Sequence, residues 1–182
     1  MPRFRLAEFK SLFADKGVAL DTQFMMSIPC NDGETKLTLD MAAHAVDVPG
    51  LNFDTTVVRR DGVGSMRTHP LAPQYTDTTV LFYLDQDGYV LDFFQSWLRQ
   101  IFPSKESSDN PHLVLEYKKT YARDIELKLY RRDNQSYATY NFINAWPVYV
   151  GTMQVQWRNE SSILVLPVRF NMDRYDHVRG ST

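Results

Sequence analysis

The sequence predicts a mainly β protein, an antiparallel β-sandwich or barrel with one principal flanking α-helix. Three observations support this fold class. Apolar and polar residues alternate along several runs, as they do on strands with one buried face. Short polar clusters separate these runs, which is the pattern of hairpins. The strongest helical periodicity is confined to one stretch, 89–102.

Composition favours a single globular domain over 1–182. The chain has 182 residues, a formal net charge of −2, 43% hydrophobic and 23% charged residues, which is ordinary for a globular protein with a substantial core. No apolar run is long enough for a membrane span, and the N-terminus lacks the apolar core of a signal peptide. The one cysteine, Cys30, excludes an internal disulfide framework, so we expect assembly in a reducing cytoplasm.

The first half of the chain predicts a short amphipathic helix followed by short strands. Helical spacing of apolar residues places this helix in the segment 1–15. We expect strands at Thr22–Ile28, Thr35–Leu39 and Phe53–Arg60, whereas 42–48 is ambiguous. The segment 59–74 carries two glycines, two prolines and several charges. It favours a long exposed loop or an extended flap.

A strand, an acidic turn and the principal helix come next. Thr76–Leu84 alternates and is rich in β-forming residues. From 89 to 102 the period changes, and Pro103 ends the helix. The helical face consists of Val90, Phe94, Trp97, Leu98 and Ile101. Asp85 and Asp87 in the turn suggest the start of a calcium loop, but the closing position is Ser96 instead of glutamate. We therefore expect an aspartate that caps the helix.

The segment 117–175 predicts a strand-rich core of four strands in hairpin order. Ile125, Leu127 and Leu129 alternate with polar residues, and the turn-compatible stretch Arg131–Gln135 precedes a second run, Tyr137–Asn144. Met153–Trp157 and Ile163–Met172 then predict a hairpin around a polar turn. Pro167 suggests a sheet edge or a bulge, because proline cannot donate to a ladder. The wet face of the 153–157 strand consists of Gln154, Gln156 and Arg158.

No constellation in the sequence indicates an enzyme, a cofactor site or a metal site. The four histidines lack ligand spacing, and Cys30 has no basic neighbour that would activate its thiol. Nucleophile-elbow, phosphate-loop and dinucleotide motifs are absent from the sequence. The basic pairs Arg59-Arg60 and Arg131-Arg132 stand beside aspartates, which favours turn charges or intersubunit ion pairs over nucleic-acid contacts.

An ordered set of pieces in the C-terminal third resembles the tail tube proteins of contractile-tailed bacteriophages. The pieces are Tyr121-Ala122-Arg123-Asp124, Ala145-Trp146-Pro147, the 153–157 strand with its polar turn, and a last strand that ends near Tyr175. The resemblance implies a structural virion protein of a contractile tail. Six copies would form a ring with one closed β-barrel, and rings would stack into a tube that conducts DNA without binding it. It also implies sheath and baseplate partners, and assembly in the host bacterial cytoplasm.

The resemblance assigns provisional roles to two groups of residues. Gln154, Gln156 and Arg158 would face the lumen of the tube. The long loop would contact neighbouring subunits through Arg59, Arg60, Arg67 and His69. A tube initiator in the baseplate and a type VI secretion tube protein are alternatives of the same architecture. A small β-sandwich module that binds a ligand is an alternative of another class, but it does not explain the ordered match.

Overall fold

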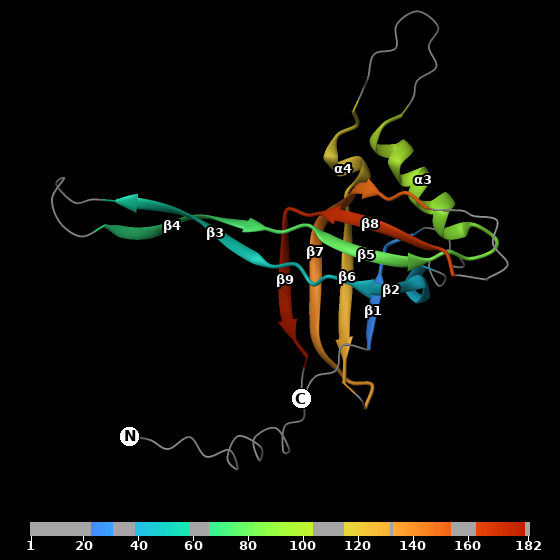
Figure 1. Ribbon diagram of the computed structural model, residues 1–182, viewed down its shortest axis with the longest axis horizontal. Helices are drawn as coiled ribbons and strands as arrows, with labels where there is room; N and C mark the ends of the chain where they lie inside the picture. Colours follow the sequence, from blue (N-terminus) through green and yellow to red (C-terminus); the bar gives the residue numbers. More distant parts are fainter. Residues whose placement is uncertain are drawn as a thin grey trace, which may run out of the picture.

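The computed structural model describes residues 23–30, 39–58, 66–103, 115–131, 133–153 and 163–180. This part of the chain is mainly β, as predicted, and Figure 1 shows its elements. The strands are β1 Phe24–Ser27, β2 Ala43–Val46, β3 Leu51–Val58, β4 Arg67–Tyr75, β5 Thr78–Tyr83, β6 Arg123–Tyr130, β7 Ser136–Val150, β8 Val165–Asn171 and β9 Arg174–Arg179. The helices are α3 Tyr89–Ile101 and α4 Lys118–Tyr121. Neither has the length and apolarity needed to cross a membrane.

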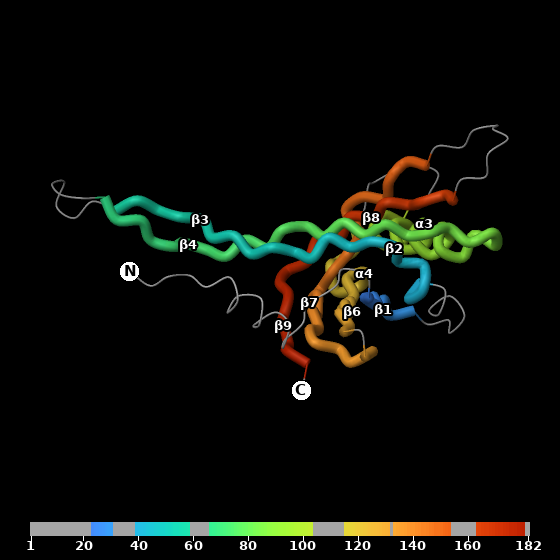
Figure 2. Tube along the Cα trace, turned by 60° about the horizontal axis from the view of Figure 1, so that its bottom comes forward, coloured from blue at the N-terminus to red at the C-terminus, as the bar shows by residue number. Residues whose placement is uncertain are grey.

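Strand β7 belongs to two layers of the fold. Its first part pairs antiparallel with β6 on one side and β9 on the other, and its end pairs with β8. We call the layer β1-β6-β7-β9 sheet A, and the layer formed by the end of β7 with β8, β5 and β2 sheet B. Figures 1 and 2 show that the strands of the two sheets run in different directions.

A bulge at Asn144 carries β7 from sheet A into sheet B. Asn144 has φ 52°, and its backbone N–H donates to the Asp124 carboxylate at 2.9 Å. The Asn144 amide donates to Asp173, which also pairs with Lys118. The hydrogen bond from Lys118, followed by that from Asn144, lowers the pKa of Asp173. An extra residue on one strand bends it, so the bulge accounts for the change of direction.

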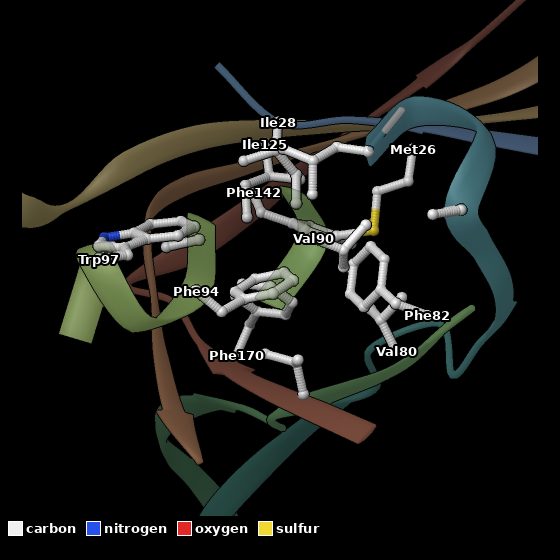
Figure 3. Close-up of a cluster of buried hydrophobic side chains, with 14 of the residues drawn as sticks. Met26, Ile28, Val80, Phe82, Val90, Phe94, Trp97, Ile125, Phe142 and Phe170 are labelled. Atoms are coloured by element: carbon white, nitrogen blue, oxygen red, sulfur yellow. The ribbon is translucent and has the colours of Figure 1, made fainter. Parts of the chain in front are cut away.

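The hydrophobic core lies between the two sheets and α3. Figure 3 shows Phe94 and Trp97 of α3 beside Phe170 of β8, with Ile125 and Phe142 of sheet A close by. These five side chains are all less than 2% exposed. The rest of the core is built from Met26, Ile28, Leu39, Ala42, Val80, Phe82, Val90, Leu127, Ala145, Leu166, Val168 and Met172.

The principal helix agrees with its prediction at both ends. Helix α3 ends at Ile101, two residues before Pro103, and buries Val90, Phe94 and Trp97 from the predicted face. At its start, the Asp85 carboxylate accepts the backbone N–H groups of Tyr89 at 2.9 Å and Val90 at 3.1 Å. The N-cap position itself is Gly88, and the expected capping carboxylate is supplied by Asp85, three residues before it. Its two oxygens satisfy donors that the first helical turn would otherwise leave without partners.

Strand β8 is confirmed, whereas its predicted hairpin partner, the 153–157 strand, lies almost wholly outside the described residues. Leu166, Val168 and Phe170 are buried as expected, and β8 pairs with the end of β7 and with β5. Of the predicted 153–157 strand only Met153 is described, and it lies outside any strand. Pro167 is therefore in the interior of sheet B, not at an edge. The Pro167 carbonyl accepts the N–H of Gly151, one residue past the end of β7, at 2.7 Å. The backbone N–H that proline lacks would point to the same side, so the missing donor lies where the β7–β8 ladder ends.

The remaining predictions have mixed outcomes. The expected strands near Thr22–Ile28, Thr76–Leu84 and Ile125–Leu129 are confirmed as β1, β5 and β6. The expected turn before β7 is confirmed by Asn134, which has φ 62°. The N-terminal helix at 1–15 and residues 35–38 lie outside the described residues. Leu39 is in a helical turn at 39–42 rather than in a strand, and α4 was not predicted within 117–175.

Strands β3 and β4 form a separate two-stranded arm that projects from the body (Figures 1 and 2). All residues of the arm are exposed except Thr56 and Tyr75. Of the two alternatives for 59–74, the extended flap agrees with the structure, because 67–75 is paired strand. The long-loop alternative is wrong for that part. Pro70 and Pro73 mislead because both strands of an isolated hairpin are edges, where proline is tolerated.

Candidate functional site

Sheet A has one buried face and one wet face. Because the strands pair in register, side chains that share a row across the sheet share a face. One such row runs Ser27, Glu126, Asn141 and Asp176, and the next runs Met25, Lys128, Thr139 and Val178. We call these eight residues, with Asp124, Arg174 and its ladder partner Ile143, the outer face of sheet A. This face points away from the core.

Charges of both signs are interspersed on this outer face. Glu126 and Lys128 form an ion pair at 2.8 Å, and this hydrogen bond is the main cause that raises the pKa of Lys128. Arg174 and Asp176 lie 3.9 Å apart on β9. With Asp124 the face carries three carboxylates and two cations, so its net charge is slightly negative. Such a surface can stay hydrated without attracting a polyanion.

Both edges of sheet A are open in the described part of the chain. Strand β1 pairs only with β6, and β9 pairs only with β7. An open edge presents a row of backbone donors and acceptors that another strand can use. Since each pairing in the sheet is antiparallel, β1 and β9 run in opposite directions. A β1 strand from a second copy could therefore continue the antiparallel order beside β9.

The arm exposes an apolar face that no described part of the chain covers. Phe53 is 56% exposed and Val57 57% exposed, and both lie on the same side of β3 as Leu51. Their partners across the ladder include Pro73 and Tyr75 of β4. A two-stranded hairpin with no cover is marginal in water, and exposed apolar patches commonly mark contact sites.

The structure places only part of the predicted site. Gln154, Gln156 and Arg158 lie outside the described residues, as do Arg59 and Arg60, so their roles stay predictions. Arg67 and His69 are exposed on β4, opposite Val58 and Thr56. They share the face of the arm opposite to Phe53, toward the far end of its ladder.

The outer face of sheet A was missed as a candidate lumen surface. The signal was present in the sequence, because Glu126 and Lys128 alternate with Ile125, Leu127 and Leu129. The alternation at 153–157 drew the assignment instead. Among the described residues no group of three histidine, cysteine or acidic side chains could hold a metal ion.

Comparisons with known proteins agree with this geometry. The model of a family described as phage tail tube protein matches residues 8–178. The fold is similar to a structure described as an extracellular contractile injection system, PVC sheath–tube complex in the extended state. The TM-score is 0.64 at 18% identity, over 93% of this chain and 97% of that chain.

Two further structures share the fold. One is described as the anti-feeding prophage baseplate, 6-fold symmetrised, with a TM-score of 0.64 at 11% identity over 89% of this chain and 96% of that chain. The other is described as the anti-feeding prophage tube terminating cap, with a TM-score of 0.65 at 15% identity over 90% and 92%. No match is found among curated proteins.

Proposed function

Since the chain belongs to the phage tail tube protein family, we propose that it is a subunit of the inner tube of a contractile phage tail. Six copies close into a ring, and rings stack into a hollow tube that conducts DNA during ejection. The family consists of structural tube proteins and not of enzymes, in agreement with the sequence prediction. The resemblance stated from the C-terminal third is confirmed at the level of the family.

The observation that carries this proposal is the four-stranded sheet A, which has one wet face and whose two edges are unpaired among the described residues. Each copy contributes an even number of alternating strands, so joining β9 to the β1 strand of the next copy preserves the antiparallel order. When the ring closes, every edge of sheet A is paired. A head-to-tail contact of this kind makes a closed ring if the rotation between copies closes.

The outer face of sheet A then lines the lumen. Most of its side chains are polar, with Met25, Ile143 and Val178 as the apolar exceptions, and its three carboxylates exceed its two cations. A lumen of this composition is wetted and repels phosphate weakly, so DNA passes without being held. This surface replaces the 153–157 strand as the main candidate for the channel wall.

The arm supplies a second contact between copies. Nothing in the described part of the chain lies over the apolar side with Leu51, Phe53 and Val57, so packing on another molecule would bury it. The opposite side presents Arg67 and His69 to the surroundings. We assign both sides to contacts with neighbouring copies, in line with the intersubunit role expected for this segment.

Sheath and baseplate proteins are the proposed partners beyond the tube itself. The support is the similarity in fold to chains from a sheath–tube complex and from a baseplate. On this proposal the protein resides in the tail of the virion after assembly in the host cytoplasm.

Size-exclusion chromatography followed by negative-stain microscopy tests the assembly. Purified protein is expected to form six-fold rings or tubes, slowly if an initiator is needed. Rings that never stack would favour the baseplate initiator. A folded species that stays monomeric at high concentration would contradict the proposal and favour the ligand-binding module.

A further inference from the structure

The arm joins the body through a narrow break in a two-stranded ribbon. Strands β2 and β5 pair with each other, and their continuations β3 and β4 pair with each other, with residues 47–50 and 76–77 between the two ladders. Across this break the Gly50 N–H donates to the Thr76 hydroxyl at 2.7 Å, and the Thr76 N–H donates to the Gly50 carbonyl at 3.1 Å. These hydrogen bonds hold the two segments of the ribbon together, but they do not determine the direction in which the arm projects.

A side-chain contact outside the ribbon supplies that direction. Tyr75, at the root of β4, packs edge-on against Tyr175 of β9, with ring centroids 5.3 Å apart and planes at 79°. Tyr75 is the one residue of β4 that is not exposed. Beyond each other, β3 and β4 make no extensive contact with any helix or strand that the structure describes. The Tyr75–Tyr175 pair is therefore the main anchor of the arm on the body.

Tyr175 is itself held firmly in sheet A. Its ring lies 5.9 Å from that of Tyr140 on β7, and Tyr140 lies 4.8 Å from His177. Tyr140 and Tyr175 both pack against the hydrophobic core. Burial, then the nearby Tyr175, raises the pKa of Tyr140. The arm is thus connected to the core through a column of rings on the open edge strand.

We infer that Tyr175 is a positioning residue that sets the direction of the arm relative to the open edge of sheet A. Strand β9 carries Tyr175 on its core-side face, and its other backbone edge, unpaired by any strand that the structure describes, is offered to another copy. The same strand, β9, therefore makes the contact that closes the ring and anchors the arm that makes the second contact. This inference rests on the proposed function for its role in assembly, whereas the link between arm and edge is a property of the single chain.

The test measures the direction of the arm in unassembled protein. Spin labels are placed on the arm by Val57→Cys and on α3 by Gln95→Cys, both exposed positions, with Cys30→Ala removing the native thiol. Pulsed electron–electron double resonance then reports the distribution of distances between the labels. The protein is kept dilute, and the monomer fraction is used.

Five versions of the labelled protein separate positioning from general destabilisation. The unsubstituted protein and Tyr175→Phe, which keeps the ring, are expected to show one narrow distance peak. Tyr175→Ala and Tyr75→Ala should lose that peak and give a broad distribution. Tyr75→Ala removes the same contact without touching the core. Tyr149→Ala, which deletes a 47% exposed tyrosine on β7, is the matched control and should keep the narrow peak.

The outcomes distinguish this inference from the proposed function. A narrow peak in both Tyr175→Ala and Tyr75→Ala overturns the positioning role, whether or not tubes form. Broad distributions in these two variants support it, even if no version assembles, in which case the proposed function fails alone. In unlabelled versions that keep Val57 and Gln95, where tubes do form, the two alanine variants should assemble more slowly than Tyr175→Phe and Tyr149→Ala.

Discussion

Replacing Trp97 by alanine should destabilise the folded subunit more than any surface substitution. The side chain is 1% exposed and lies among Phe94, Phe170 and the guanidinium of Arg123. Its indole N–H donates to the Tyr121 carbonyl at 2.7 Å. Removing a buried tryptophan costs about 3–5 kcal/mol through lost burial and the cavity that remains. The carbonyl left without its donor adds about 1 kcal/mol.

The loss of about 5 kcal/mol should be seen in both thermal and urea unfolding followed by circular dichroism. For a protein of this size it corresponds to a fall in Tm of roughly 10–20 °C. Trp97→Phe is the matched control, since it keeps a ring in the core but loses the donor to Tyr121. Its cost should be about 1–3 kcal/mol. If Trp97→Ala shifts the Tm by only a degree or two while assembly fails, Trp97 is a contact between subunits and its placement in the core is wrong.

Three further predictions concern the cap, a close approach and the arm. Asp85→Ala should cost about 1 kcal/mol at neutral pH. Burial opposes ionisation of Asp85, but the backbone N–H donors of α3 lower its pKa below the usual value. This stabilisation is therefore present above the unfolded pKa and is lost as pH falls through the folded pKa, so the unfolding curves of the protein and the variant should differ at neutral pH and converge in acid. Gly151→Ala should cost about 1–3 kcal/mol in a thermal melt, because its Cβ would lie 2.3 Å from Pro167, whereas the control Gly50→Ala meets only an ordinary contact at 3.5 Å. Phe53→Asp should change the stability of the monomer by no more than about 0.5 kcal/mol yet prevent tube formation in the microscope, because its site is exposed until a second copy covers it.

The elements that could be predicted from the sequence are those whose side-chain period matches their burial. Helix α3 was found because Val90, Phe94 and Trp97 repeat at helical spacing and all face the core. Strand β6 was found because Ile125 and Leu127 are buried and alternate with Glu126 and Lys128. Local periodicity is sufficient in such cases, because the element packs one face against the core and that face alone is apolar.

Strand pairing could not be read from the same pattern. Strand β7 was expected to end at Asn144, because Pro147 follows shortly after it and proline commonly interrupts a strand. In the structure Asn144 takes a positive φ, and Pro147 pairs with Phe170 inside sheet B. The choice of β7 as the partner of β8 depends on this change of direction, which is a tertiary effect. The same limit moved the candidate lumen surface from 154–158 to β6.

A strand at Phe53–Arg60 and an extended flap were expected and are confirmed as β3 and β4, but their pairing into a separate arm escaped prediction for a different reason. Its apolar residues, such as Phe53 and Val57, are not buried by any described part of their chain, so the spacing of apolar residues does not relate them to the core. The prolines at 70 and 73 indicate a loop when a strand is assumed to have neighbours on both sides. Which residues are apolar on such a contact face depends on the surface of the second copy that covers it. Local patterns in the sequence do not reveal that surface.

Crosslinking of the two open edges of sheet A tests the central claim most directly. Met25 and Val178 stand at opposite ends of one row of the sheet, three strand spacings or about 14 Å apart within a copy. A disulfide needs Cβ atoms about 3.5–4.5 Å apart, so Met25→Cys with Val178→Cys cannot join within one copy. Strands in barrels tilt, so β9 of one copy can be shifted along β1 of the next. A second pair, Met25→Cys with Asp176→Cys, therefore tests a register shifted by two residues along β9. Both pairs are made with Cys30→Ala and oxidised after assembly.

On a non-reducing gel, at least one pair should give a ladder of linked copies that ends at six, whereas each single cysteine variant should give no band beyond a dimer. The account predicts this ladder because β9 of one copy lies beside β1 of the next around a closed ring. If both pairs remain monomeric on the gel, although circular dichroism shows folded protein and microscopy shows assembled particles, sheet A does not form the ring.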